Sequence, residues 1–511
     1  MLLHDLLRDS ARRFPDKVGI IFSNRSYRFR EIDEASDRLA CEFQRLGLHR
    51  GDRVAAMLDN SFEMVVALWG ALKAGAVFVP ISPTIKADKL SFLLADSGSA
   101  AFIASGHLRQ RVEEATAQAS FSGATVWVGD NAELVGIRLS EILARPHQAP
   151  ADRGLIDQDL CLIIYTSGST GSPKGVMMTH RSICNNVWSI STYLGNRSDD
   201  VVLCVLPLSF DYGLFQVLTG ARLGFTVVLE RSFAYPYDVL KRIGEYRVTG
   251  LPGVPTIFAK MLEFAPFEGL NLGSLRYLSN TAAPFPSAHI QALRQLLPQA
   301  AIFSMYGLTE CTRVSYLHPS RLEAKMTSVG RAMPNSETYI VDEHGRRCGP
   351  REVGELVVRG TSVMRGYWQR PEETAKALRD GDIPGEKVLF TGDLFYKDEE
   401  EDLYFVGRRD DVFKCRGEKV SPREVEACLY ELDSVAEVAV VGVPHPIDGM
   451  AIKAHIVPRD GQLISEELLR KQCQRRLEPL LVPRFFELRP SLPKTDSGKI
   501  MKKTLRQVAG N

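Results

Sequence analysis

The first half of the chain alternates short apolar segments, which suit β-strands, with longer amphipathic segments, which suit helices. Strands are predicted at 17–22 and 52–58, and helices at 26–47 and 61–73, where apolar residues recur at helical spacing. The strand pattern then returns at 76–81, 201–207, 226–230 and 301–307. Alternation of this kind favours an α/β fold, with a large multi-layer N-terminal domain built on mostly parallel sheets.

The C-terminal part of the sequence differs, because short strands and turns lead into a compact segment. Two predicted helices there each begin at a serine suited to an N-cap, Ser421 and Ser465, and strands are predicted at 435–443 and 451–458. A unit of about a hundred residues is large enough to form a small α+β domain. The predicted parts are an N-terminal domain at 1–407, a junction at 408–411 and a C-terminal domain at 412–511.

Composition and charge limit the classes of partner. At 511 residues the chain exceeds one ordinary domain, and 45% hydrophobic with 24% charged residues is typical of a globular protein. The 63 basic residues nearly balance the 62 acidic ones, which leaves a net charge of +1. This balance provides no general attraction to nucleic acid or an anionic membrane, so neither is expected as a partner. Any anion must therefore be bound by a local group of residues.

Cysteine usage and the apolar stretches indicate the compartment. The nine cysteines are scattered and form no C-x-x-C pair, which disfavours a disulfide framework or a zinc site and fits a reducing, cytoplasmic location. Charged residues interrupt the apolar ones at 1–17, so the unbroken core of a secretory signal is absent. The stretch 62–81 contains Glu63, Lys73 and Gly75, and therefore predicts a helix followed by a strand, with no transmembrane segment.

A loop rich in glycine and hydroxyl residues lies in IIYTSGSTGSPKGVMMTH, at 163–180, directly after a predicted buried strand. Its glycines allow the backbone to approach an anion closely, so that successive N–H groups can converge on it. The hydroxyls add donors, and the lysine adds a positive charge. The residues predicted to bind phosphate are Thr166, Ser167, Gly168, Ser169, Thr170, Gly171 and Lys174.

A Walker A loop and a flexible linker both fit this stretch less well. A Walker A loop ends in Gly-Lys-Ser/Thr, whereas here Pro173 precedes Lys174 and Gly175 follows it. A flexible Gly/Ser linker seldom follows a buried strand or ends in Pro-Lys-Gly. The loop therefore predicts a phosphate site of another kind.

Five further stretches look unlike ordinary core or surface sequence. They are LPLSFDYG at 206–213, SMYGLTEC at 304–311, TGDLF at 391–395, GRRDDVFKCRGEKVSP at 407–422 and LPKTDSGKIMKKTLR at 492–506. Each alone is compatible with a purely structural role, since a Gly-Asp turn is more often structural and a basic C-terminal run is usually a solvated surface. Together with the phosphate loop, and in this order, they resemble the adenylate-forming superfamily: AMP-forming acyl-CoA synthetases, adenylation domains of peptide synthetases, and luciferases. The resemblance covers nearly the whole chain.

The resemblance implies an ATP site. Thr166 through Lys174 would hold the β- and γ-phosphates, and Asp393 would accept hydrogen bonds from both ribose hydroxyls. The other residues implied to contact the nucleotide are Tyr306 with Gly307 at the adenine, Thr309 at the α-phosphate, and Arg408. A further adenine contact falls on Ala282, in NTAAPFP at 280–286, where the family often has Gly-Gly-Ala-Pro.

The implied chemistry explains the charged residues. A carboxylate attacks the α-phosphorus of ATP, which gives acyl-AMP and pyrophosphate. Since the attacking group and the phosphate are both anions, positive charge is needed where they meet. By the resemblance, Glu310 would hold Mg²⁺, and Lys499 would bridge the substrate carboxylate and the α-phosphate. Together with Lys174 they form the implied catalytic set, and no protein nucleophile is required.

The resemblance also implies a second step. The small C-terminal domain would rotate about Asp410 as the hinge, withdraw Lys499 and present the loop at Gly417 to a pantetheine thiol. Without that motion Asp410 would be only a turn or N-cap residue. Members that stop at acyl-AMP carry an insertion in this junction, and none is present here. The acceptor would therefore be CoA or the phosphopantetheine of a carrier protein acting in trans.

The sequence leaves the acid open. Asp211, with Gly213 and Asn280, is placed in the substrate pocket, at the position where amino-acid-activating members carry an aspartate for the substrate ammonium. A buried aspartate without a cation is costly, which hints at an amine. Against that, YGLTE and SFDYGLFQVL are more similar to acyl-CoA ligases, and Asp211 would also suit the start of the following helix.

The resulting prediction is an ATP- and Mg²⁺-dependent acid–thiol ligase that acts on a small-molecule carboxylic acid and makes an acyl-CoA or acyl-carrier thioester, as in fatty acid metabolism. The alternative is a stand-alone amino-acid adenylating enzyme that loads a peptidyl carrier protein. A regulator without ligase activity would be expected to lack Glu310, Lys174 or Lys499, and all three are present. A luciferase-like oxygenase shares the same motifs and is the third possibility.

Overall fold

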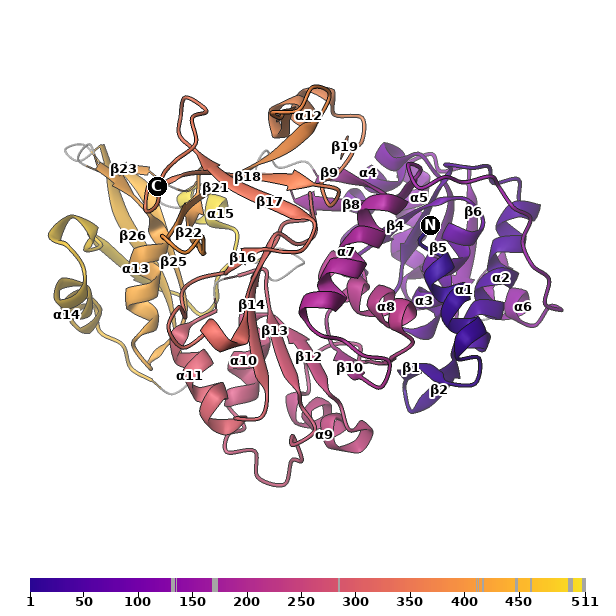
Figure 1. Ribbon diagram of the computed structural model, residues 1–511, viewed down its shortest axis with the longest axis horizontal. Helices are drawn as coiled ribbons and strands as arrows, with labels where there is room; N and C mark the ends of the chain where they lie inside the picture. The colour runs from indigo at the N-terminus through magenta and orange to yellow at the C-terminus, as the bar shows by residue number, and fades with distance from the viewer. Residues whose placement is uncertain are drawn as a thin grey trace.

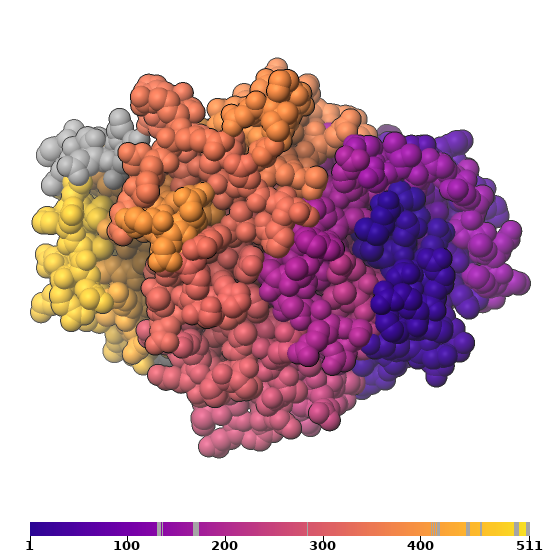
Figure 2. Space-filling view, in the orientation of Figure 1, coloured from indigo at the N-terminus to yellow at the C-terminus, as the bar shows by residue number. Residues whose placement is uncertain are grey.

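A computed structural model of the protein describes residues 1–129, 134, 136–167, 173–283, 285–409, 411, 413–415, 418–445, 449–459, 462–494 and 500–507. The N-terminal elements lie at one end of the molecule and the C-terminal elements at the other (Figure 1). Figure 2 shows the segments around residues 300–400 between these two ends. Within the described ranges, none of the helices has the length and apolar character needed to cross a membrane.

The first of two large sheets has nine strands in the order β16-β15-β14-β13-β12-β10-β11-β1-β2. Its centre, from β14 to β1, is parallel, and the outer strands are antiparallel. The strands are β1 (Val18–Phe22), β2 (Arg25–Arg28), β10 (Val201–Cys204), β11 (Thr226–Leu229), β12 (Gly250–Gly253), β13 (Tyr277–Asn280), β14 (Ala301–Tyr306), β15 (Ser315–Leu317) and β16 (Arg331–Ala332). The predicted parallel sheet is thereby confirmed.

The second large sheet has eight strands in the order β19-β9-β8-β4-β3-β5-β6-β7. It is parallel from β8 to β7, while β9 and β19 are antiparallel additions at one edge. The strands are β3 (Arg53–Met57), β4 (Val77–Ile81), β5 (Ser99–Ser105), β6 (Ala124–Val128), β7 (Ile137–Arg138), β8 (Leu160–Ser167), β9 (Pro173–Thr179) and β19 (Gly366–Tyr367). The antiparallel edge carries the predicted phosphate loop between β8 and β9.

Helices fill the space between and around the two sheets. They are α1 (Asp5–Arg13), α2 (Phe29–Arg45), α3 (Phe62–Lys73), α4 (Ala87–Ser97), α5 (Arg109–Gln118), α6 (Leu139–Leu143), α7 (His180–Tyr193), α8 (Asp211–Leu223), α9 (Pro236–Tyr246), α10 (Pro255–Leu262), α11 (Ser287–Leu296) and α12 (Pro371–Ala377). Helix α7 contacts β9, α8 contacts β10 and β11, and the two helices pack on each other between the sheets (Figure 1). In α3 every residue except Glu63 is buried, as expected of a helix enclosed on all sides.

A smaller antiparallel sheet leads to the C-terminal part. Its order is β17-β18-β21-β20, with β22 also on β21. The strands are β17 (Ser336–Val341), β18 (Gly354–Gly360), β20 (Leu378–Asp380), β21 (Lys387–Lys397) and β22 (Leu403–Arg408). The C-terminal elements are the hairpin β23 (Phe413–Cys415) and β24 (Glu418–Val420), the sheet β25 (Val435–His445), β26 (Gly449–Pro458) and β27 (Phe485–Leu488), and the helices α13 (Pro422–Tyr430), α14 (Glu466–Arg476) and α15 (Lys502–Gln507).

The two predicted serine caps behave differently. Ser465 caps α14 through its hydroxyl, which accepts from the backbone N–H of Leu468 at 3.2 Å. Ser421 occupies the predicted N-cap position of α13, but its side chain makes no cap hydrogen bond within the described residues. Its hydroxyl instead donates to the carbonyl oxygen of Val406 in β22 at 2.6 Å. That bond joins the first C-terminal helix to the last strand of the preceding sheet.

Two buried histidines near the N-terminus make stability depend on pH. His180 Nδ1 accepts from the backbone N–H of Leu3 at 2.9 Å, and its ring packs edge-on to that of His4. Burial lowers the pKa of His180 to about 4 and that of His4 to about 3. The unfolded chain takes up these protons near pH 6.5, whereas the folded chain does not. The folded state is therefore at its most stable, relative to the unfolded chain, above pH 6.5, and it loses stability as the pH falls toward 4.

The free energy of unfolding should therefore fall by roughly 2–4 kcal/mol per histidine between pH 6.5 and 4. Urea denaturation at a series of pH values measures this slope. His180→Asn keeps an acceptor for the Leu3 N–H but does not titrate, so its slope should be shallower. His344, an exposed histidine, provides the control, because His344→Asn should leave the slope unchanged. Equal slopes for His180→Asn and the wild type would contradict the assignment.

Candidate active site

The candidate site lies where neighbouring parallel strands end. Asn280 is the last residue of β13 and Tyr306 the last of β14, and these two strands pair in parallel register. The carboxyl ends of adjacent parallel strands meet at one edge of a sheet, which is where α/β proteins bind ligands. After Tyr306 the chain turns through Gly307, Thr309 and Glu310 before returning as β15, with Ser315 opposite Tyr306.

Gly307 has no room for a side chain. A Cβ there would lie 2.4 Å from the carbonyl oxygen of Thr312 and 3.0 Å from the Cα of Arg313. Both contacts involve backbone atoms, so the turn after β14 folds back on itself only because this residue is glycine. The close approach fixes the direction in which Thr309 and Glu310, both half-buried, leave the strand.

The phosphate-loop prediction falls on the hairpin between β8 and β9. Thr166 is the register partner of Lys174, and Ser167 that of Pro173, so the two strands close directly beneath the loop. The predicted phosphate ligands Gly168, Ser169, Thr170 and Gly171 lie outside the described residues. The described ends of the hairpin place Lys174 at its rim, half-buried.

Tyr367 connects the hairpin to Glu310, and sequence reasoning missed it. It belongs to β19, which pairs antiparallel with β9. Its hydroxyl donates to Glu310 Oε1 at 2.8 Å, and Lys174 Nζ lies 5.4 Å from the centroid of its ring. Burial, followed by the adjacent Glu310 carboxylate, raises the pKa of Tyr367 well above its usual range, so it stays a donor. The two adjacent aromatic residues in GYW, at 366–368, were the feature of the sequence that could have pointed to Tyr367.

Glu310 is a carboxylate with a neutral donor beside it. Within the described part of the chain, no Lys, Arg or His nitrogen lies within 4.0 Å of its oxygens. Among the described residues, no group of three or more His, Cys, Asp and Glu side chains is placed to hold a metal. Mg²⁺ is commonly bound by one or two carboxylates together with substrate phosphates, so a single unneutralised carboxylate near a phosphate loop fits this ion.

The third part of the site is built by β21 and β22. Asp393 and Arg408 are register partners on these strands, and Arg408 Nε lies 3.5 Å from Asp393 Oδ1. Asp393 is only 4% exposed, and Oδ2 accepts from the Tyr306 hydroxyl at 2.5 Å. Burial, followed by the Asp393 carboxylate, raises the pKa of Tyr306 well above its usual range. The structure thus brings together three residues that are far apart in the sequence.

The segment after β13 has an unusual backbone. Ala282 is exposed and has φ +74°, a left-handed conformation that a non-glycine residue adopts at a cost. Asn280, 1% exposed, donates from Nδ2 to the carbonyl oxygen of Ala283 at 3.3 Å, while its Oδ1 has no hydrogen-bond partner among the residues that the structure describes. The strained turn therefore presents backbone groups at the edge of the sheet beside Tyr306.

Asp211 and Gly213 stand at the start of α8. Helix α8 begins at Asp211 with Phe210 as its N-cap, and Asp211 Oδ1 accepts from the N–H of Tyr212 at 2.8 Å. A carboxylate in the first turn is favoured by the helix dipole, which agrees with the structural alternative for Asp211. A Cβ on Gly213 would lie 2.3 Å from the carbonyl oxygen of Pro207, so close packing alone requires this glycine.

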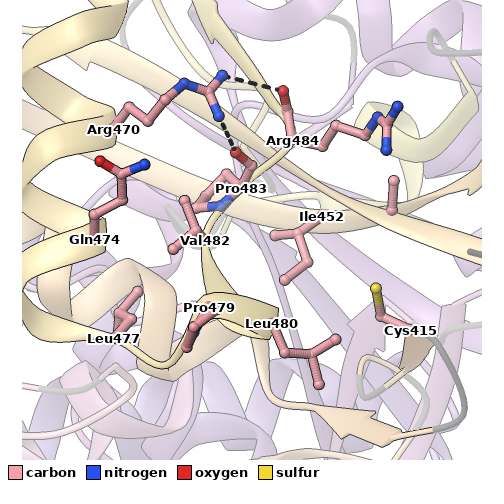
Figure 3. A pocket seen from close by; sticks show the side chains of 11 residues that line it. Cys415, Ile452, Arg470, Gln474, Leu477, Pro479, Leu480, Val482, Pro483 and Arg484 are labelled. Carbon is pink, nitrogen blue, oxygen red and sulfur yellow. Dashed lines mark hydrogen bonds between the residues drawn. The ribbon is translucent and has the colours of Figure 1, made fainter.

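Three further predicted residues, Asp410, Gly417 and Lys499, lie outside the described residues. Beside the hairpin β23–β24, the C-terminal part contains a cavity of about 430 Å³ (Figure 3). Its lining includes Cys415, Gln474, Arg470 and Arg484 but no acidic residue. The guanidinium of Arg470 donates to the carbonyl oxygens of Pro483 at 3.1 Å and of Arg484 at 3.3 Å. Arg470 is also paired with Glu466 at 2.6 Å, so part of the positive charge beside the cavity is already neutralised. A neutral or anionic group still fits this lining better than a cation.

Two family models match the chain. The AMP-binding enzyme model matches residues 7–368, and the AMP-binding enzyme C-terminal domain model matches residues 424–499. Together they include the phosphate-loop hairpin, the turn after β14 and the C-terminal domain.

Curated and solved relatives match over nearly their whole length. A long-chain-fatty-acid–CoA ligase of Bacillus subtilis (strain 168) is 31% identical, over 98% of this chain and 94% of its own. A feruloyl-CoA synthase of Amycolatopsis sp is 33% identical, over 98% and 97%. Structures of o-succinylbenzoate CoA synthetase from Bacillus subtilis are 27% identical. The complex with the acyl-adenylate intermediate has a TM-score of 0.87 and covers 98% of this chain and 97% of that one. The complex with ATP and magnesium ion has a TM-score of 0.86 and covers 99% of both.

Proposed function

The chain belongs to the AMP-binding enzyme family, and from this premise we propose how its residues carry out AMP-forming acid–thiol ligation. The enzyme activates a carboxylic acid with ATP to acyl-AMP, releases pyrophosphate, and then transfers the acyl group to a thiol with release of AMP. The observation that carries the residue assignment is the contact set around one strand end. Lys174, Tyr367 and Glu310 form one side of it, and Tyr306 and Asp393 form the other.

The adenylation step needs positive charge and fixed orientation rather than a nucleophile from the protein. The substrate carboxylate attacks the α-phosphorus, and the bond to the pyrophosphate oxygen breaks. Lys174, at the rim of the phosphate-loop hairpin, would neutralise the leaving pyrophosphate, while Lys499 would lie between the carboxylate and the α-phosphate. Thr309 would donate to the α-phosphate. Together these groups stabilise charge that develops only as the bonds change.

The nucleoside would be held by the second side of the site. Asp393 is buried and anionic, so its carboxylate can accept from both ribose hydroxyls while Arg408 and Tyr306 hold its orientation. The Tyr306 ring would stack on adenine, and Ala282 would present backbone groups to it from the strained turn. Glu310 would hold Mg²⁺, which when bound neutralises phosphate charge, and Tyr367 would fix the orientation of that carboxylate.

For the acceptor, we propose CoA rather than a carrier protein. The similar curated enzymes are named as CoA ligases or synthases. The cavity beside the hairpin β23–β24, whose described lining includes two arginines and no acid, suits the anionic character of CoA. A phosphopantetheine carrier remains the alternative acceptor, since its reactive thiol is the same.

We propose that the part after β22 moves as a unit between the two half-reactions. The proposed boundaries are 1–407 for the adenylation domain, 408–411 for the hinge with Asp410, and 412–511 for the mobile domain. Strand β22 ends at Arg408 and the next hairpin begins at Phe413, so the hinge falls between elements. A cytoplasmic location is proposed because the nine cysteines are scattered and no disulfide joins them among the described residues, which suits a reducing compartment.

The test is acid-dependent pyrophosphate release without any thiol, across fatty, aryl and amino acids. We expect release with non-amino acids, followed by thioester formation only when CoA is added. Release with amino acids alone, abolished by Asp211→Ala, would favour the alternative of an enzyme that loads a peptidyl carrier protein. No release with any acid would contradict the proposal, provided that circular dichroism shows a folded protein.

A further inference from the structure

Arg313 is a buried cation next to the candidate site. It is 3% exposed and lies three residues after Glu310, in the stretch between β14 and β15. Its guanidinium carbon lies 4.8 Å from the centroid of the Tyr212 ring, and it also neighbours the phenol of Tyr193. Among the described residues, its Nε atom has no hydrogen-bond partner and no Asp or Glu oxygen lies within 4.0 Å of its guanidinium.

A charge in such a place is costly without a counter-ion. Moving a guanidinium out of water is unfavourable unless it is paired and hydrogen-bonded. The Tyr212 ring supplies a cation–π attraction and the phenol oxygen of Tyr193 accepts a hydrogen bond from Arg313, but neither group carries a negative charge. The described residues thus stabilise the position of Arg313 without neutralising it. An anionic group on a ligand would complete the arrangement.

Further buried polar atoms without a hydrogen-bond partner among the described residues lie beside Arg313 in the sequence, at the end of β13 and on α7. Thr312 Oγ1 and Ser315 Oγ flank Arg313 in the sequence, and both are buried without a hydrogen-bond partner in the part of the chain that the structure describes. Asn280 Oδ1, at the end of the strand next to β14, is likewise unpaired. Asn186 is 0% exposed with both amide atoms unpaired. These residues (Asn186, Asn280, Thr312, Arg313 and Ser315) form what we call the polar wall.

Helix geometry connects Asn186 to the rest of this wall. It lies seven residues before Tyr193 on α7, so the two side chains project from the same face, about 10 Å apart along the axis. Tyr193 is the residue that neighbours Arg313. The unpaired atoms therefore extend for about two helical turns from Arg313 rather than clustering at one point.

The polar wall adjoins the predicted acyl pocket. Tyr212, which faces Arg313, stands between the predicted pocket residues Asp211 and Gly213. Its hydroxyl donates to the backbone oxygen of Ser279 at 2.7 Å, one residue before Asn280. Ser315 is the register partner of Tyr306. The wall thus runs between the predicted acyl pocket and the predicted adenine site.

Resting on the proposed function, we infer that the substrate is a carboxylic acid bearing a second carboxylate, and that Arg313 binds that second group. The guanidinium fork matches a carboxylate in two parallel hydrogen bonds. The remaining polar-wall atoms would bind oxygens along the acid. A plain hydrocarbon acid would cover these groups without satisfying them, which costs binding energy at each one.

Matched acid pairs test this directly. Pyrophosphate release is measured for hexanoate against adipate, octanoate against suberate, and benzoate against its three carboxy-substituted forms. On the best skeleton, the dicarboxylate should have a kcat/KM about 10–100-fold above that of its monocarboxylate. Arg313→Met, which fills similar volume without charge, should lower the dicarboxylate value by that factor and leave the monocarboxylate value equal or higher.

A control separates specificity from folding. Arg276 also lies over a tyrosine ring, at 5.0 Å from that of Tyr277, but is paired with Asp200 at 2.8 Å. Arg276→Met should lower the melting temperature and leave the preference between the paired acids unchanged. If the wild type prefers the monocarboxylate on every skeleton, the inference about Arg313 is overturned, whereas the proposed function is not affected. An equal loss on both acids in Arg313→Met would also overturn it, whereas no release with any acid would overturn the proposed function.

Discussion

Replacing Glu310 by glutamine is expected to lower kcat for acyl-AMP formation by about 10²–10³-fold, by analogy with the loss of one well-placed charge-stabilising group. The substitution keeps the shape of the side chain and leaves an oxygen to accept from Tyr367. It removes the negative charge that would hold Mg²⁺ near the phosphates. The measurement is pyrophosphate release at saturating acid over a series of Mg²⁺ concentrations. The Mg²⁺ concentration for half-maximal rate should rise as kcat falls.

Tyr367→Phe is the matched control for that variant. It removes the hydroxyl that orients Glu310 but keeps the carboxylate and the ring beside Lys174. Its effect should be smaller, about tenfold, because one hydrogen bond is lost while the negative charge of Glu310 remains. If Glu310→Gln leaves the Mg²⁺ dependence unchanged, or if Tyr367→Phe costs as much as Glu310→Gln, the assignment of Glu310 to the metal is wrong.

Asp393→Asn is expected to raise the KM for ATP by about 10–100-fold, with a smaller change in kcat, because charge-assisted hydrogen bonds are about twice as strong as neutral ones. The asparagine keeps one acceptor oxygen, but its amide group cannot accept from the second ribose hydroxyl. It also leaves Arg408 without its charge partner at 3.5 Å. Most of the loss should therefore appear in nucleotide binding. Initial rates over a range of ATP concentrations give both constants.

Tyr306→Phe separates the hydrogen bond between Tyr306 and Asp393 from the contact of the Tyr306 ring with adenine. It removes the hydrogen bond of 2.5 Å to Asp393 but keeps an aromatic ring for adenine. We expect the KM for ATP to rise by less than about tenfold in this variant. The rise should therefore be larger for Asp393→Asn than for Tyr306→Phe. A melting temperature within a few degrees of the wild type would show that the sheet β21–β22 is intact. Unchanged KM for ATP in Asp393→Asn would contradict the ribose assignment.

Local patterns in the sequence were sufficient to predict much of the fold. The alternation of strands and helices predicted β1, α2, β3, α3 and β4 within a few residues, because periodicity and chain length report which faces are buried. The parallel sheets followed from that alternation. The N-cap position of Ser421 was predicted correctly, but the partner of its hydroxyl was not predictable, because that partner lies on β22, a strand that local sequence does not place nearby.

The candidate site was predictable only in part. Motif residues such as Tyr306, Glu310 and Asp393 stand out because glycine turns and isolated acids after strands are unusual. Tyr367 and Arg313 did not stand out, since a tyrosine or an arginine is common and its function depends on its neighbours. Tyr367 matters because β19 pairs with β9, and Arg313 matters because Tyr212 and Tyr193 enclose it.

By itself, the sequence determined the α/β class, the order of many elements, the position of a glycine- and hydroxyl-rich loop after a buried strand, and the reaction that the motifs imply. Only the tertiary structure decided which of these residues meet. Asp393 reaches Tyr306, which lies 87 positions earlier, and Tyr367 reaches Glu310 across 57 positions. Such contacts depend on sheet order and register, which arise from the packing of the whole chain and are not encoded in any short segment. For the same reason, only the folded chain reveals that Arg313 is buried with no counter-ion among the described residues.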